Sequence, residues 1–438
     1  MNHLNTHGQT KLIKLASGLQ LVLYQSPYKN TVSLNMRIAA GSKWDPQGKL
    51  GLAHLVEHML FQGTKTRQSS YALTSQIESL GGGLFGATHQ EYCSYWLNIP
   101  HRYFTQSLPI FTDMLSNPLF SADSIENEKK VIIDEIAEID EQGWYTAYQL
   151  LDQALWPSHP LGNSIIGTKE GVQALSQSDV QSFFYQHYTP ERMVAAVVGN
   201  ISENEVINLF EQLWSHSADK ISDVYRPNEP ILSSARVVHK HNESNVAHLA
   251  LGIKLPPIDD ASWGAIMILQ ALLGQGMSSL LYTTLRGKGL CYSVDSDLDE
   301  FCHSTILSIY VATKPKQTIT VIEEVVRTLH VLTTIGITEK QMDDVRKLCI
   351  GTTLMQADKA KFHSRLLSLS TFLTDKTLSV SDQITQLEQV TLNQLRELIH
   401  EALRPSNLFG GFYGLLSPSV VNTCQDLMTT NWSNPKKH

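Results

Sequence analysis

Hydrophobic and polar residues alternate in several short runs of the chain. Residues 18–24 (GLQLVLY), 31–38 (TVSLNMRI) and 92–99 (YCSYWLNI) place apolar side chains at alternate positions, which predicts half-buried β-strands. Residues 125–140 (IENEKKVIIDEIAEID) and 318–333 (TITVIEEVVRTLHVLT) instead repeat their apolar residues with the period of an amphipathic helix. Strands and helices are partly segregated along the chain. This arrangement predicts an α+β fold in which antiparallel-rich sheets pack against helices.

The two halves of the chain resemble each other. The segments that begin at Leu175 and Val390 align without a gap under a shift of 215 residues. Each segment reads as an amphipathic helix, a turn marked by proline and a short strand that ends at glycine. Residues 32–38 and 247–253 are related by the same shift and alternate in the same phase. The sequence therefore predicts two homologous domains that arose by internal duplication.

These similarities place the N-terminal domain at about residues 10–215 and the C-terminal domain at about residues 235–430. The segment between them, residues 216–234 (HSADKISDVYRPNEPILSS), is polar and contains proline and serine, which is typical of a linker. A chain of 438 residues is also longer than one compact core normally uses. Length and internal similarity thus agree on two domains.

Charge and cysteine usage narrow the class of protein. The formal net charge of −8 argues against a dedicated nucleic-acid-binding protein, which would carry basic stripes. No apolar run is long enough to predict a membrane span. The five cysteines are scattered without a CxxC pair, and the N-terminal residues resemble neither a secretory signal nor an Arg-rich transit peptide. We therefore expect a cytoplasmic protein with reduced thiols.

A candidate metal-binding motif lies in residues 51–64 (GLAHLVEHMLFQGT). His54 and His58 are four residues apart, so on a helix both imidazoles can face one ion. Glu57 lies beside them, near enough to act on a water bound to that ion. A zinc ion that activates water needs three protein ligands and one open position. A third ligand is therefore expected from another part of the chain.

The third ligand is expected from residues 126–135 (ENEKKVIIDE). Glu128 and Glu135 are seven residues apart, which is two helical turns, so their side chains share one face of a helix. One of the two carboxylates can complete a His₂Glu zinc site. The other can orient a histidine from outside the ligand shell.

The alternative interpretation of the His-Glu-His pattern is an ordinary solvated helix face. Six neighbouring residues of the motif are apolar: Leu52, Leu55, Val56, Met59, Leu60 and Phe61. This composition predicts a largely buried helix. Burying two imidazoles and a carboxylate is costly unless they are paired or bound to a metal ion.

The second half of the chain allows a comparison. Under the 215-residue shift the four polar candidates correspond to apolar residues: His54 to Leu269, Glu57 to Leu272, His58 to Leu273 and Glu135 to Ile350. The same positions are therefore expected to be plain core in the C-terminal domain. We assign the metal to the N-terminal domain only.

With these motifs in place, the sequence resembles the pitrilysin-type zinc metallopeptidases, the inverzincins, whose HxxEH motif reverses the usual HExxH. It is most similar to the two-domain branch that includes mitochondrial processing peptidase and its bacterial relatives, and the resemblance covers nearly the whole chain. The resemblance implies Zn²⁺ bound by His54, His58 and Glu135, with Glu57 as the general base. Glu128 falls on the family's second acidic position.

Two further family elements can be compared. Residues 285–294 (LRGKGLCYSV) match the family's Arg-to-Tyr element at Arg286 and Tyr292, which implies that these residues contact the substrate near the scissile carbonyl. By contrast, Phe85 and Gly86 stand where the family usually has an Asn-Ala pair. This departure removes one amide that would bond to the substrate backbone, and we expect Phe85 to be ordinary core or pocket wall.

The resemblance implies a zinc-dependent endopeptidase that hydrolyses peptides or unfolded polypeptide segments. Relatives with four such domains close like a clamshell, so a homodimer of this two-domain chain, or a pair with a related companion subunit, is expected to form the chamber. The substrate backbone is expected to add to a sheet edge near residues 88–95. Two other functions stay open: a non-catalytic structural or partner subunit of a peptidase complex, and a metal-dependent hydrolase that acts on something other than peptides.

Overall fold

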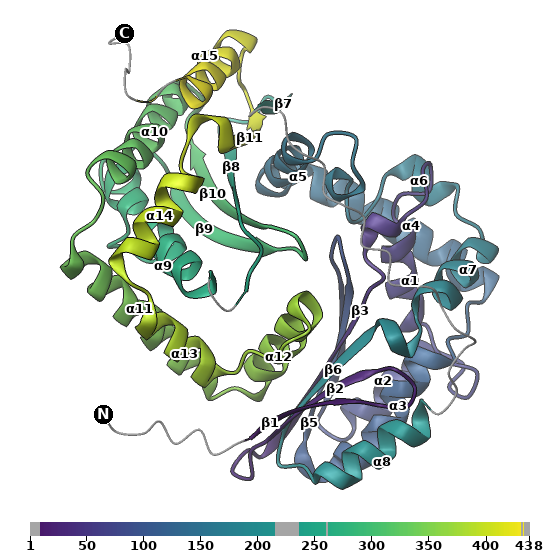
Figure 1. Ribbon diagram of the computed structural model, residues 1–438. Helices are drawn as coiled ribbons and strands as arrows, with labels where there is room; N and C mark the ends of the chain where they lie inside the picture. The colour runs from purple at the N-terminus through teal and green to yellow at the C-terminus, as the bar shows by residue number, and fades with distance from the viewer. Residues whose placement is uncertain (1–8, 215–235, 260–261, 431, 433–438) are drawn as a thin grey trace. The chain divides into compact units, whose positions relative to one another are not determined.

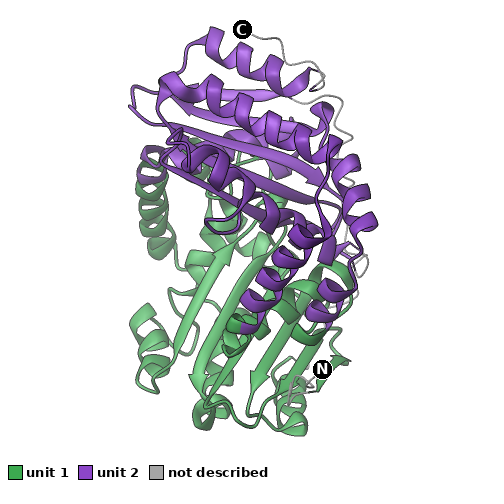
Figure 2. Cartoon of the chain, turned by 90° about the vertical axis from the view of Figure 1, so that its left-hand side faces the viewer, with its two compact units in different colours: residues 1–137, 163–227, 355–381 green, residues 138–162, 228–354, 382–438 purple. Residues whose placement is uncertain are grey.

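The computed structural model describes residues 9–214, 236–259, 262–430 and 432, which form helices and two β-sheets (Figure 1). The predicted linker, residues 216–234, lies outside the described residues. The chain divides into two compact units (Figure 2): unit 1 contains residues 1–137, 163–227 and 355–381, and unit 2 contains residues 138–162, 228–354 and 382–438. The α+β prediction is confirmed. Among the described residues, no helix has the length and apolar character needed to cross a membrane.

Unit 1 contains, within the described residues, a six-stranded sheet of order β1-β2-β6-β3-β5-β4. Its strands are β1 (Thr10–Lys14), β2 (Gln20–Gln25), β3 (Thr31–Ile38), β4 (Gly83–Thr88), β5 (Cys93–Pro100) and β6 (Met193–Gly199). Neighbouring strands are antiparallel, except that β2 and β6 are parallel. The helices that lie wholly or mostly in this unit are α1 (Leu52–Leu60), α2 (Ser70–Glu78), α3 (Phe104–Ser116), α4 (Ala122–Glu141), α6 (Lys169–Gln173), α7 (Gln177–His187), α8 (Glu203–Leu213) and α12 (Ala360–Thr374).

Helices cover both faces of the unit 1 sheet. On one face, α1, α3 and α7 pack against the sheet and form a large apolar core that includes Leu34, Val56 and Phe111. On the other face α12 packs against β3 and β6, and its Leu367 joins a smaller apolar cluster with Val22. Strand β3 is buried from its second residue onward because it lies between these two layers.

Unit 2 contains, over the part of the chain that is described, a five-stranded sheet of order β7-β11-β8-β10-β9. Its strands are β7 (Val237–His241), β8 (Ala247–Leu255), β9 (Ser293–Glu300), β10 (Thr305–Thr313) and β11 (Leu408–Gly414). Its helices are α5 (Gly143–Leu155), α9 (Trp263–Gly274), α10 (Thr318–Thr334), α11 (Glu339–Ala357), α13 (Val380–Gln389), α14 (Leu392–Ala402) and α15 (Pro418–Thr429).

The internal duplication is confirmed by the order and bounds of these elements. Shifting β6 by 215 residues reproduces the bounds of β11, and the same shift carries α7 onto α14. The equivalent strands β2-β6-β3-β5-β4 and β7-β11-β8-β10-β9 follow one order in the two sheets. The helix pairs α1 and α9, and α4 and α11, also correspond.

Each compact unit takes one helix from the other half of the sequence. Helix α12 belongs to unit 1 and its counterpart α5 belongs to unit 2, so the units differ from the contiguous segments 10–215 and 235–430. In unit 2, α5 packs on β11 and β8. A Cβ atom added at Gly411 would overlap the backbone of Ala147 and Leu151 in α5. Glycine in β11 therefore permits the close approach of this helix to the sheet.

Candidate metal centre

Helix α1 carries the HxxEH motif and is largely buried, as the apolar composition around the motif predicts. Six of its residues are buried: Leu52, Ala53, Leu55, Val56, Met59 and Leu60. His54, Glu57 and His58 are only partly buried, and they lie on the remaining face of the helix. The buried stripe fixes α1 against the sheet and so fixes the direction in which the polar side chains point.

Asp45 holds the start of α1. One carboxylate oxygen accepts a hydrogen bond from the Gly51 amide at 2.7 Å, and the other accepts from the Ala53 amide at 2.8 Å. Gly51 has a φ of 99°, a left-handed conformation that favours glycine. Burial raises the pKa of Asp45 to about 7, against the opposing effect of the backbone amides. The sequence alone did not single out Asp45, because it lies six residues before Gly51, the N-cap position of α1.

Replacing Asp45 with alanine should lower the melting temperature of the metal-free protein. The change leaves two amides at the start of α1 without their acceptor, at a cost of roughly 1–3 kcal/mol for each buried group. Asp45→Asn keeps one acceptor oxygen and should be less destabilising than Asp45→Ala. Thermal unfolding followed by circular dichroism measures both. Equal melting temperatures for Asp45→Ala and the wild type would contradict this capping role.

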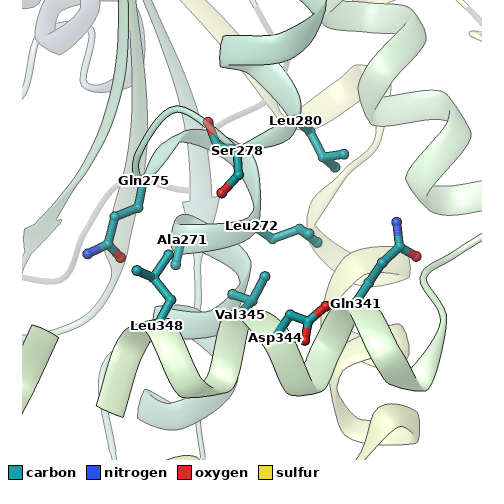
Figure 3. Close-up of a pocket in the computed structure, with 10 residues that line it drawn as sticks. Ala271, Leu272, Gln275, Ser278, Leu280, Gln341, Asp344, Val345 and Leu348 are labelled. Atoms are coloured by element: carbon teal, nitrogen blue, oxygen red, sulfur yellow. The ribbon is translucent and has the colours of Figure 1, made fainter. Parts of the chain in front are cut away.

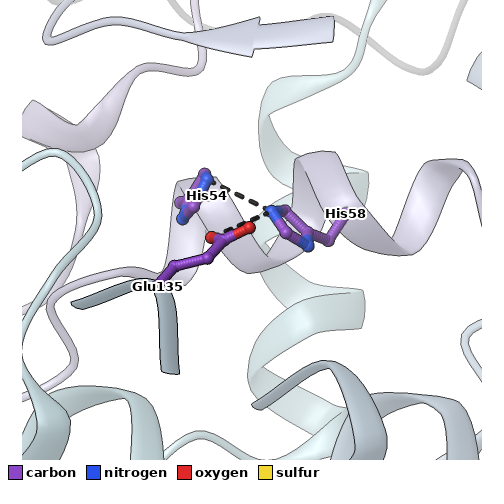
Figure 4. A group of neighbouring side chains, drawn as sticks. All are labelled: His54, His58 and Glu135. Atoms are coloured by element: carbon purple, nitrogen blue, oxygen red, sulfur yellow. Dashed lines mark hydrogen bonds and ion pairs between the residues drawn. The ribbon is translucent and has the colours of Figure 1, made fainter. Parts of the chain in front are cut away.

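The structure brings His54, His58 and Glu135 together (Figure 4). One ligand atom from each of these residues lies within 4.8 Å of the other two. The Nε2 atoms of the two histidines are 3.2 Å apart, and Oε2 of Glu135 is 3.7 Å from Nε2 of His58. The histidines come from α1 and the carboxylate comes from α4.

Glu128 occupies a different place from Glu135. Its Oε2 accepts a hydrogen bond from Nδ1 of His58 at 2.9 Å, and its Oε1 accepts from the side-chain amide of Gln62 at 2.8 Å. Because both oxygens are engaged, Glu128 orients His58 and fixes its tautomer, which leaves the Nε2 lone pair directed toward His54 and Glu135. Helical spacing alone left the roles of the two glutamates interchangeable, whereas the family resemblance assigned the ligand role to Glu135; neither gave a signal for Gln62.

The two histidines differ in their electrostatic surroundings. Burial, with a smaller contribution from the neighbouring His58, lowers the pKa of His54 to about 3, so its imidazole is neutral at physiological pH. Burial also acts to lower the pKa of His58, but the hydrogen bond that His58 donates to Glu128 and the negative charges of Glu135 and Glu57 outweigh it and raise that pKa. Nδ1 of His54 is buried and has no hydrogen-bond partner among the described residues.

The side chain of Glu57 extends from α1 toward the edge of the sheet. Its Oε2 accepts a hydrogen bond from the Thr88 hydroxyl at 2.6 Å. A Cβ atom added at Gly86 would lie 2.8 Å from Oε1 of Glu57 and 2.9 Å from the Phe61 ring, so Gly86 leaves room for the carboxylate. Burial raises the pKa of Glu57, and the Thr88 hydrogen bond opposes that rise. An isolated glycine inside a strand is a known sign of close approach, and this sign could have identified Gly86.

The open edge of the sheet beside Glu57 is β4. In the described chain β4 pairs with β5 and ends the strand order, whereas β5 lies between β3 and β4. The prediction of an edge near residues 88–95 is therefore wrong by one strand, because that range runs into the internal strand β5. Phe85 in β4 is 45% exposed, so of the two expectations, core or pocket wall, the core alternative is wrong.

Arg286 and Tyr292 lie in unit 2. Arg286 ends a π-helical turn, Tyr282–Arg286, and its side chain is exposed. Tyr292 is 49% exposed and directly precedes β9, where its amide donates to the carbonyl of Ala312 at 2.7 Å. Both side chains are thus accessible, and the substrate contacts expected of them stay a prediction.

Unit 2 has a pocket between the helices that correspond to α1 and α4. It has a volume of about 330 Å³ and lies between α9, the loop that follows α9, and α11 (Figure 3). Leu272, which corresponds to Glu57, lines this pocket with Ala271, Val345 and Leu348. The helix pair that carries the polar cluster in unit 1 therefore encloses in unit 2 a pocket lined by both apolar and polar side chains, with Leu272 at the position that corresponds to the glutamate.

Two family models match consecutive parts of the chain. Residues 20–169 match a model described as insulinase (peptidase family M16), and residues 174–349 match a model described as peptidase M16 inactive domain. The chain belongs to peptidase family M16. The polar cluster on α1 and α4 falls within the first M16 match, and the pocket of unit 2 falls within the second.

Curated relatives of this chain carry the name of zinc proteases. The chain is 28% identical over 396 residues to an uncharacterised zinc protease of Mycobacterium leprae, covering 89% of this chain and 88% of that protein. It is 27% identical over 406 residues to an uncharacterised zinc protease of Bacillus subtilis, with 92% and 97% covered. M16 relatives of this chain are thus named as zinc proteases.

Two solved structures share the fold. A protease from Helicobacter pylori gives a TM-score of 0.86 at 20% identity, covering 93% of this chain and 99% of that one. A chain in the structure of complex III2 from Candida albicans gives a TM-score of 0.81 at 14% identity, with 96% and 100% covered. Identities this low show a shared fold alone.

Proposed function

We propose that the protein is a zinc-dependent endopeptidase that hydrolyses peptides or unfolded polypeptide segments. The observation that carries this proposal is the convergence of one ligand atom each from His54, His58 and Glu135 beside the carboxylate of Glu57. Two imidazoles and one carboxylate are a donor set that catalytic zinc uses, with a position left for water or substrate.

The donor chemistry of the cluster fits zinc. His54 is neutral, and the bond from Nδ1 of His58 to Glu128 leaves the His58 Nε2 lone pair available. Partial burial of the Glu135 carboxylate and the two imidazoles costs free energy. A bound cation would offset this cost by pairing with all three groups. When bound, the zinc ion supplies Lewis-acid chemistry, which lowers the pKa of a water and polarises the peptide carbonyl.

The residues of the chain supply the proton transfers. We assign Glu57 as the general base that takes the proton of the attacking water and returns it to the leaving amine. Thr88 fixes one carboxylate oxygen of Glu57, and Gly86 keeps space open beside the other. The raised pKa of Glu57 brings this base closer to neutral pH, where proton transfer in both directions is easier.

We further propose that the substrate backbone pairs with the open edge of β4. An extended peptide can continue a sheet at such an edge through main-chain hydrogen bonds. Gly86 and Thr88 of β4 both lie against Glu57, so a peptide on this edge passes the general base. Arg286 and Tyr292 would contact the substrate near the scissile carbonyl and stabilise its developing charge.

A homodimer that encloses a chamber is the proposed assembly, and a related companion subunit is the other arrangement. Both the metal motif and the Arg286–Tyr292 element occur in this one chain, so two copies could supply complete sites. We also propose a cytoplasmic location, because none of the five cysteines forms a disulfide.

Metal removal and restoration test the proposed function. The zinc-loaded protein should contain about one zinc per chain and cleave members of a quenched-fluorescent peptide library. A chelator should abolish cleavage, and added Zn²⁺ should restore it, because the three ligands are preorganised. Metal content by mass spectrometry and fluorescence give the two readouts. A zinc-loaded protein that cleaves no peptide would favour a partner subunit or a hydrolase for another substrate.

A further inference from the structure

Strand β4 presents an exposed aromatic ring next to the proposed substrate edge. Phe85 is the cross-strand neighbour of Trp96 in β5, and their rings stack with centroids 5.5 Å apart and an interplanar angle of 16°. The ammonium group of Lys361, from α12, lies 5.8 Å from the Phe85 ring centroid and 5.2 Å from that of Trp96. All three residues belong to unit 1.

This aromatic pair faces away from the metal cluster. Successive side chains of a strand point to opposite faces of the sheet. Gly86 and Thr88 face Glu57, so Phe85 points to the other face, where α12 packs. The side chains of a peptide that pairs with β4 would alternate between the two faces in the same way. Every second side chain would point to the face that carries Phe85.

Cationic groups surround this face of β4. Lys361 is exposed, and Arg365 follows it four residues later in α12, so the two side chains share one side of that helix. Arg365 and Arg37 lie close enough to His89, directly after β4, that their charges add to the effect of burial in lowering the pKa of that histidine. Three cationic side chains, Lys361, Arg365 and Arg37, therefore lie near the face that carries Phe85.

We propose that Phe85, Trp96 and Lys361 form a specificity subsite that selects an acidic side chain in the bound peptide. This inference rests on the proposed peptidase function and on pairing of the peptide with β4. The methylene groups of a glutamate can lie on the Phe85 ring while its carboxylate pairs with the Lys361 ammonium. A lysine at the same position would bring a like charge to Lys361. Phe85 stands where the family resemblance predicts an asparagine. An aromatic ring at this position gives β4 an apolar contact for a substrate side chain in place of the asparagine amide.

A set of matched peptides tests the subsite. Each quenched peptide carries a single Glu, Gln or Lys, moved one position at a time along both sides of the cleaved bond. We expect the wild type to prefer Glu over Lys by about five-fold in kcat/KM at one or more positions spaced by two residues. Lys361→Glu should reverse that preference, and Phe85→Ala should weaken it. Lys359→Glu makes the same charge change two residues away and should keep the wild-type order.

Binding gives a readout that does not depend on turnover. The Glu57→Gln variant should bind the Glu peptides more tightly than the Lys peptides in fluorescence anisotropy, and Glu57→Gln/Lys361→Glu should reverse the order. No Glu preference at any position, or a preference unchanged in Lys361→Glu, would overturn the subsite. Selective binding without hydrolysis by the zinc-loaded wild type would refute the peptidase function and leave the subsite standing.

Discussion

Replacing Glu57 with glutamine should abolish peptide hydrolysis while zinc stays bound. Glutamine cannot take up the proton of the attacking water, and general-base catalysis contributes about 10²- to 10⁴-fold. The amide is close in size to the carboxylate and can still accept the Thr88 hydrogen bond, so the surroundings should change little. We therefore expect kcat/KM to fall by about that factor, with metal content by mass spectrometry unchanged.

Glu138→Gln is a matched control for this variant. Glu138 lies exposed near the end of α4, and its substitution removes one negative charge, as Glu57→Gln does. It should retain wild-type turnover and metal content. Turnover in Glu57→Gln equal to that of Glu138→Gln would remove Glu57 from the mechanism, whatever its position beside the cluster.

Replacing Glu135 with glutamine should remove most of the zinc affinity. The variant keeps the two imidazoles but loses the negative charge and the third ligand of the proposed site. Loss of an outer partner such as Glu128 typically lowers metal affinity by about 10–100-fold, and loss of a direct ligand should cost more. Competition with a zinc-binding dye measures the affinity of each variant, and the melting temperature of the metal-free proteins checks folding.

Glu128→Gln is the comparison that separates the two glutamates. It weakens the orienting bond to His58 but leaves all three proposed ligands in place. The expected order of zinc affinity is therefore wild type, then Glu128→Gln, then Glu135→Gln. If Glu128→Gln bound zinc more weakly than Glu135→Gln, the roles assigned to the two carboxylates would have to be exchanged.

Local sequence patterns predicted several individual elements of this fold. The alternating run at residues 31–38 coincides with β3, and the helical periods at residues 125–140 and 318–333 fall within α4 and α10. The period of the apolar residues is a local property, because it reflects which side of one element is buried. The spacing of His54 and His58 placed both imidazoles on one side of α1 for the same reason.

Some features of the site depended on contacts between distant segments. The sequence offered two carboxylates on one helix face, and only the positions of His58 and Gln62 show that Glu128 is engaged through both oxygens. Likewise, β4 is an edge strand because no described strand pairs with its outer side. The local sequence pattern of a strand does not show whether it lies at an edge. The error in the predicted edge follows from this difference.

By itself, the sequence determined the α+β class, the duplication and a metal motif confined to one half. The tertiary structure decided which helix covers which sheet, since α5 and α12 each pack in the unit formed mainly by the other half. An amphipathic pattern shows that a helix has a face to bury, but the partner surface depends on close approach between distant residues. The backbone of α5 can reach β11 because Gly411 has no side chain in its way.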